Sequence, residues 1–70
     1  MKLIVQVTQV RKAKGLTQAD LAQLANVSRK TINTIENNVF VPSTILALTL
    51  AKVLDVSVQD LFKLPDTSDL

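Results

Sequence analysis

Residues 17–37 read TQADLAQLANVSRKTINTIEN, a pattern that predicts two short helices joined by a tight turn. Thr17 is a good N-cap, and Asp20 three residues later completes an imperfect capping box for a helix over about 18–25. Asn26 stands where the chain must turn, since Asn tolerates the left-handed region better than other residues that carry a side chain. Ser28 then caps a second helix over about 29–37.

The helix expected over 29–37 has two distinct faces. At about 100° per residue, Ile32 and Ile35 fall on the side that should meet the core. Lys and Arg can donate hydrogen bonds to guanine or phosphate, Asn can pair with adenine, and a Thr methyl can contact a thymine methyl. A side built from these residue types suits the major groove of B-DNA, and the alternative is an ordinary solvated face. The opposite side of the helix consists of Lys30, Asn33, Thr34 and Asn37, flanked by Arg29 and Thr31.

The helix expected over 18–25 strengthens the interpretation of this polar face. Ala22 and Ala25 are small residues on the side that should meet the next helix, so the two helices can cross at close range. The amino end of the first helix would then point toward the same partner. That end offers free N–H groups together with Thr17 and Gln18, all of which suit phosphate.

The rest of the chain predicts an all-α domain of five helices. Further helices are expected over about 5–14, 44–54 and 58–63, with Gly15, Ser43 and Ser57 as caps. Residues 2–7 are rich in β-branched types, so a minor two-stranded β patch between this segment and the residues after the fifth helix is a further option. We expect one domain over 1–64 and a polar tail over 65–70.

Composition excludes several kinds of site. The 70 residues contain no Cys and no His, which removes disulfides, the commonest metal ligands and the commonest general base. We therefore expect no metal and no cofactor. The acidic residues Asp20, Glu36, Asp55 and Asp60 are spread over four segments, so an enzyme is not expected. The apolar start is too short for a signal sequence or a membrane span, which leads us to expect a soluble, cytoplasmic protein.

Charge is unevenly distributed along the chain. Residues 1–54 hold seven Lys or Arg and two acidic residues, whereas residues 55–70 hold one Lys and four Asp. The positive part contains the two-helix motif, so its field favours an anionic partner, with an ordinary solvated surface as the alternative.

The chain resembles the helix-turn-helix domains of phage repressors and Cro, in the Xre group of bacterial and phage transcriptional regulators. The similarity extends over about residues 5–63, and the family usually has Gly at the position of Asn26. Gln18 matches the hallmark glutamine of the family. The matching segments are Thr17-Gln18-x-x-Leu21-Ala22, Asn26-Val27-Ser28, Ile32, Ile35-Glu36-Asn37, Pro42-Ser43, Leu46-Ala47, Leu50-Ala51 and Leu54-Asp55-Val56-Ser57.

The resemblance implies roles for individual residues. Arg29, Lys30 and Thr34 match positions that read base edges, and Asn33 lies beside them. Arg11 and Glu36 match an ion pair between the first and third helices, whereas the alternative for Arg11 is a charge that faces DNA. The positions that contact the phosphate backbone are matched by Thr17, Gln18, Thr31 and Asn37.

The helix expected over 44–54 is apolar nearly all round, and a domain of 70 residues has little room to bury every side of it. Part of its surface is therefore expected to meet a second copy. Leu61 and Phe62 are assigned to the core instead. The candidate residues for a dimer interface are Phe40, Val41, Ile45 and Leu48, with Val56 and Val58 as a second surface.

Together these features predict a sequence-specific regulator of transcription that binds double-stranded DNA. We expect a homodimeric repressor on a pseudo-palindromic operator, with half-sites about 34 Å apart. The alternative is an antitoxin or a protein-interaction module on the same fold, with a protein partner such as a toxin. The polar face over 29–37 argues against a purely protein-binding role, because apolar anchors would be expected there.

Overall fold

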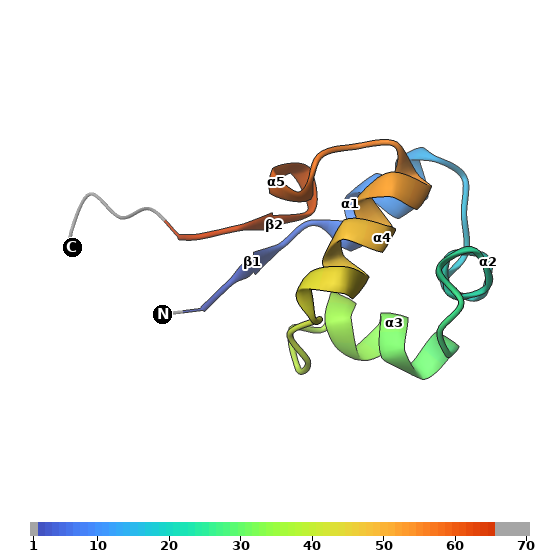
Figure 1. The fold of residues 1–70 in the computed structure, drawn as a ribbon, viewed down its shortest axis with the longest axis horizontal. Coiled ribbons are helices and arrows are strands. Elements are labelled where there is room, and N and C mark those ends of the chain that lie inside the picture. The colour runs from blue at the N-terminus through green and yellow to red at the C-terminus, as the bar shows by residue number, and fades with distance from the viewer. Residues whose placement is uncertain (1, 66–70) are drawn as a thin grey trace.

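Five helices and a two-stranded antiparallel sheet form the fold of residues 2–65, the part of the chain that the computed structural model describes (Figure 1). The predicted all-α domain with a minor β patch is confirmed. The tail predicted over 65–70 lies outside the described residues except for Pro65. In chain order the elements are β1 (Ile4–Val5), α1 (Val7–Ala13), α2 (Gln18–Ala25), α3 (Arg29–Glu36), α4 (Thr44–Leu54), α5 (Val58–Leu61) and β2 (Phe62–Lys63).

Each of α2 to α5 begins at the cap that the sequence predicts. In every case the cap hydroxyl accepts a hydrogen bond from the backbone N–H three residues later, which satisfies one of the free donors of the first turn. The carboxylates of Asp20 and Asp60 accept in return from the backbone N–H of Thr17 and Ser57, so both are complete capping boxes. The four caps are Thr17, Ser28, Ser43 and Ser57.

A left-handed residue follows each of the helices α1 to α4. Gly15 (φ 74°) follows α1 and Asn26 (φ 59°) follows α2, as the sequence predicts. Asp55 (φ 57°) ends α4, and Asn38 (φ 59°) lies just beyond α3. Three of these four positions carry Asn or Asp, the side-chain types that tolerate this conformation best.

Two predicted helix boundaries are wrong by two residues, both for the same reason, while the ends predicted for the first and third helices are each one residue too late. Val5 pairs with Phe62 and Ile4 with Lys63, so the first helix starts at Val7 rather than at residue 5 and the last ends at Leu61 rather than at residue 63. The backbone N–H of Gln6 also donates to the Leu61 carbonyl at 2.8 Å. Pairing between the two ends of the domain therefore overrides local helical preference.

The core draws on all five helices. Ala22 and Ala25 are buried and let α2 lie close to α3 and α4. Leu24, on the same helix, is 56% exposed. Outward-facing Ile45 and Leu48 show that α4 is not buried on every side. The buried apolar residues are Val7, Leu21, Ala22, Ala25, Ile32, Ile35, Leu50, Ala51, Leu54 and Leu61.

The elements are arranged so that α2 and the sheet lie on opposite sides of the domain, with α3 along its lower edge in Figure 1. Between residues 2 and 65, no helix has the length and apolar character needed to cross a membrane.

Candidate nucleic-acid interface

The third helix is divided between the core and the surface. Ile32 and Ile35 have no exposed surface, whereas Arg29, Lys30 and Asn33 are exposed. Thr31 and Thr34 are half-buried beside them and Asn37 is exposed just after the helix. The six polar residues that the sequence assigns to the outward face therefore lie together on one side of α3.

Open hollows flank this face. On the side of α2, Gln18, Arg29, Lys30 and Asn33 line a hollow of about 440 Å³. A neighbouring hollow of about 520 Å³ lies at the start of α2 and includes Thr17 and Gln18. On the other side of α3, a hollow of about 390 Å³ is lined by Ser28, Lys30, Thr31, Thr34, Val39 and Phe40. The third helix thus forms a ridge between two depressions.

An ion pair fixes α3 to α1. Arg11 Nε lies 2.7 Å from Glu36 Oε2, Arg11 Nη2 lies 3.1 Å from Glu36 Oε1, and the two side chains are only 10% and 4% exposed. Arg11 Nη1 also donates to the Leu16 carbonyl at 2.9 Å. The pair that the family resemblance implies is therefore present, and Arg11 does not face outward as the alternative required.

The ionisation of this pair reflects both its burial and its hydrogen bonds. Burial alone would raise the pKa of the Glu36 carboxyl, but hydrogen bonds from Arg11, Gln18 and Thr8, together with the charge of Arg11, outweigh it. The pKa of Glu36 therefore lies below its ordinary value. The hydrogen bond to Glu36 in turn raises the pKa of Arg11, so both groups are charged near neutral pH.

Gln18 connects the ion pair to the outward face of α3. Its amide nitrogen donates to Glu36 Oε1 at 3.0 Å, and its amide oxygen accepts from Asn33 at 3.4 Å. Asn37 donates to the side-chain oxygen of Asn33 at 3.1 Å. A chain of polar contacts thus leads from Glu36 to Asn37, and the sequence patterns did not anticipate the contact of Gln18 with Glu36.

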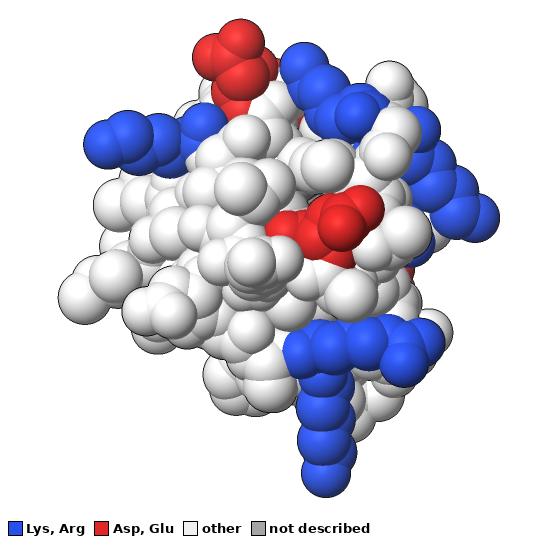
Figure 2. All heavy atoms as spheres, turned by 90° about the vertical axis from the view of Figure 1, so that its right-hand side faces the viewer, with Lys and Arg blue, Asp and Glu red and all other residues white. Residues whose placement is uncertain are grey.

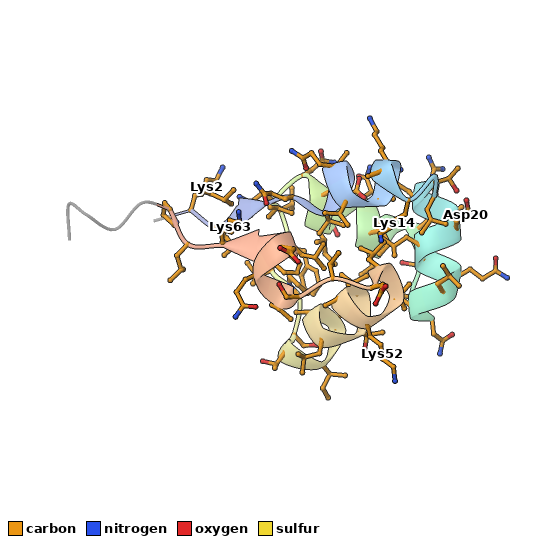
Figure 3. The ribbon with its side chains drawn as sticks, turned by 90° about the horizontal axis from the view of Figure 1, so that it is seen from above. Lys2, Lys14, Asp20, Lys52 and Lys63 are labelled. Carbon is orange, nitrogen blue, oxygen red and sulfur yellow. The ribbon has the colours of Figure 1, made fainter. Side chains whose placement is uncertain are left out.

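Basic side chains surround part of this surface. Seen from the side of α2, Lys and Arg side chains lie at the lower edge, at the upper right and at the upper left (Figure 2). Arg29 and Lys30 are the first two residues of α3. Other lysines are remote from α3. Figure 3 places Lys63 on β2 and Lys2 just before β1, at the end of the domain away from α2, and Lys52 on α4.

The residues expected at a dimer interface divide between two surfaces. Ile45 is 78% exposed, and Val41 (64%) and Leu48 (56%) line an apolar groove of about 220 Å³. Phe40 lines the hollow beside α3 instead. Val56 is half-buried against the core and Val58, also half-buried, reaches the groove. The groove is lined by Leu3, Val41, Pro42, Thr44, Ala47, Leu48, Val58 and Phe62.

Comparison with known protein families and curated proteins gives consistent matches. A helix-turn-helix family model matches residues 7–61. An uncharacterized HTH-type transcriptional regulator of Methanocaldococcus jannaschii is 44% identical over 52 residues, which cover 74% of this chain and 79% of that protein. The uncharacterized HTH-type transcriptional regulator YgzD of Bacillus subtilis is 33% identical over 60 residues, covering 86% of this chain and 91% of YgzD.

Solved structures with the same fold include two regulators. The restriction-modification controller protein C.AhdI from Aeromonas hydrophila superposes with a TM-score of 0.74 at 31% identity, covering 77% of this chain and 82% of that one. SinR, a master regulator for biofilm formation solved in complex with DNA, gives a TM-score of 0.71 at 37% identity, covering 76% and 86%. SinR also matches in its complex with the SinI protein, where 52% of that chain is covered.

Proposed function

Because the chain belongs to the helix-turn-helix family of Xre- and Cro-like transcriptional regulators, we propose that it is a homodimeric repressor that recognises a specific sequence of double-stranded DNA. The observation that carries this proposal is the outward face of α3. Polar and basic side chains cover that face, while two fully buried isoleucines hold it against the core. A rigid helix with such a face fits the major groove.

The residues that contact base edges in this proposal are Arg29, Lys30, Asn33 and Thr34. Arg29 and Lys30 are exposed and can donate to guanine O6 and N7, and Asn33 can form two hydrogen bonds with adenine. The Asn33 side chain is already restrained by Gln18 and Asn37. A restrained amide loses less rotamer freedom on binding, which favours selective contacts.

The residues that contact the phosphate backbone in this proposal are Thr17, Gln18, Thr31 and Asn37. The first turn of α2 presents free backbone N–H groups to the same side as α3, and the helix dipole favours an anion there. One amide N–H of Gln18 donates to Glu36. The second remains for a phosphate oxygen, since a Gln amide carries two donors.

Dimerisation through the apolar groove would complete the binding site. The groove is lined entirely by uncharged residues. A two-fold axis can therefore place the groove of one copy against that of a second copy without repulsion between like charges. Two copies of α3 would then read the two halves of a pseudo-palindromic operator about 34 Å apart. A protein that acts on cellular DNA in this way would work in the cytoplasm.

A second function is favoured by one comparison. SinR is a structural neighbour that has been solved in complex with the SinI protein. A partner chain, such as a toxin paired with this protein as its antitoxin, could occupy the same apolar groove. In that case the protein would act as an interaction module, with or without DNA binding.

The test is selection of DNA ligands from a random-sequence duplex library, followed by footprinting on the selected sequence. Lys30→Ala should weaken binding to that sequence by about 1–3 kcal/mol, and raising salt from 50 to 200 mM should weaken it by orders of magnitude. Lys52→Ala removes a charge on α4, away from α3, and should have little effect. No enrichment of any sequence by the unmodified protein would refute the proposal.

A further inference from the structure

Three consecutive apolar residues are exposed in the loop between α3 and α4. Val39 is 77%, Phe40 46% and Val41 64% exposed. In Figure 1 this loop projects beside the carboxyl end of α3. The three residues line two different surfaces. Val41 lines the groove on α4, whereas Val39 and Phe40 line the hollow beside α3.

Backbone contacts hold Val39 and Phe40 next to α3. Their N–H groups donate to the carbonyl of Thr34 at 2.9 and 3.2 Å. The hollow they line also includes Lys30, Thr31 and Thr34, which belong to the proposed DNA-binding face. The apolar wall is therefore continuous with that face and is fixed at its edge.

The chemistry of this hollow differs from that of its counterpart on the other side of α3. The Thr34 hydroxyl donates to the Thr31 carbonyl at 2.9 Å, and the Thr31 hydroxyl lies 2.9 Å from that of Ser28. The Thr34 hydroxyl is thus engaged within the protein, and the hydroxyls of Ser28 and Thr31 share one hydrogen bond. What the hollow offers a ligand is mainly methyl groups and one aromatic ring, and Lys30 also belongs to its lining.

We propose that Val39 and Phe40 form a pocket for a thymine methyl group and so specify an A·T pair at the edge of each half-site. This inference rests on the proposed binding of DNA. The thymine methyl is the apolar group that a base pair presents in the major groove. Continuity with the face of α3 and the positive charge of Lys30 favour DNA as the occupant, and they assign Phe40 to the DNA rather than to the dimer interface.

The test replaces each thymine of the selected DNA by uracil, one at a time, which removes only the methyl group. Affinity is measured by fluorescence anisotropy for the unmodified protein, Phe40→Ser and Val39→Ser. At one or more positions uracil should weaken binding of the unmodified protein roughly fourfold, the effect of losing one buried methyl-sized group. The same replacement should have no effect on binding by Phe40→Ser.

Two controls keep the result interpretable. Leu24→Ser changes an exposed leucine of α2 that lines neither the groove nor this hollow, and should keep the full response to uracil. Circular dichroism checks folding, and should Phe40→Ser unfold, the comparison is made with Val39→Ser, whose side chain is more exposed. Sedimentation of each variant reports its oligomeric state.

The inference is overturned if uracil has the same effect on the unmodified protein and on the folded loop variants at every position. It is equally overturned if Phe40→Ser dissociates the dimer while the uracil profile stays unchanged. Both results leave sequence-specific binding intact, so they differ from a failure of the proposed function, in which the unmodified protein selects no DNA.

Discussion

Arg11 and Glu36 meet edge to edge across the contact between α1 and α3, with two nitrogens of the guanidinium on the two oxygens of the carboxylate. The contact joins the last turn of α3 to a helix that lies behind it. Because Gln18 shares the same carboxylate, the start of α2 is tied to the same point. The charge pair therefore links both helices that face the proposed ligand, in addition to their apolar packing.

Breaking this pair from one side should destabilise the domain severely. Arg11→Ala leaves the Glu36 carboxylate buried without its cation, which is expected to cost about 3 kcal/mol of unfolding free energy. Urea unfolding followed by circular dichroism measures the loss. Lys12→Ala removes an exposed neighbouring charge and should change stability by less than about 0.5 kcal/mol.

The double variant Arg11→Met, Glu36→Met distinguishes a lost charge pair from lost packing. It leaves no unpaired charge in the interior, so it should be more stable than Arg11→Ala. A double variant as unstable as the single one would contradict the assignment of the cost to the isolated carboxylate.

Stability should depend on pH through Glu36. Folding lowers the pKa of this carboxyl, so its ionised form stabilises the folded state above its unfolded pKa, and that contribution is lost as pH falls through the folded pKa. Glu36→Gln should therefore be less stable than the unmodified protein at pH 7. The difference should shrink at acidic pH, below the ordinary pKa of Glu.

Thermal unfolding of both proteins across this pH range provides the measurement. The pKa values of Asp20 and Asp60 are also lowered, mainly by the backbone N–H groups of Thr17 and Ser57. Both proteins keep these carboxylates, so only the difference between them reports on Glu36. A difference that is constant with pH would exclude its ionisation as the source.

A further prediction concerns the stability of variants at the left-handed residue between α2 and α3. Asn26 has φ 59° and ψ 44°, a region that costs most residues with a Cβ roughly 1 kcal/mol, Asn less and glycine nothing. Asn26→Ala should be destabilised by about that amount, because Asn tolerates the region better than Ala. Asn26→Gly should be at least as stable as the unmodified protein. Denaturant unfolding measures both, with Gln23→Ala on the exposed side of α2 as a control that should lose no stability.

Dimerisation through the groove on α4 can be tested with two leucines of equal exposure. Leu48 and Leu24 are both 56% exposed, but only Leu48 lines the groove. Leu48→Asp should shift sedimentation toward the monomer, since a two-fold interface would bring the two introduced carboxylates together. Leu24→Asp should sediment like the unmodified protein. Equal behaviour of the two variants would show that the groove is not the interface.

The sequence patterns predicted most of the helical framework because its signals are local. The cap and the residue it binds are three positions apart, so Thr17, Ser28, Ser43 and Ser57 mark the helix starts without knowledge of the fold. The bounds predicted for α2 and α4 agree with those observed. The same periodicity separates Ile32 and Ile35 from the polar side of α3.

Features that depend on distant contacts were missed or misplaced. Phe62 continues a helical pattern, and only its pairing with Val5 turns it into a strand. The hydrogen bond of Gln18 with Glu36 depends on how α2 crosses α3, which no spacing along the chain encodes. Phe40 and Val41 are adjacent apolar residues that the sequence patterns do not distinguish, yet the path of the loop places them on different surfaces.

The division of α3 into inner and outer positions has a consequence for how binding preferences can evolve. The inner positions Ile32 and Ile35 contribute to the core, whereas Arg29, Lys30 and Asn33 are exposed. Exposed positions of a helix accept most substitutions with little change in stability. A library randomised at these three codons should therefore stay largely folded, and new DNA preferences could arise through single substitutions without passing through unstable intermediates.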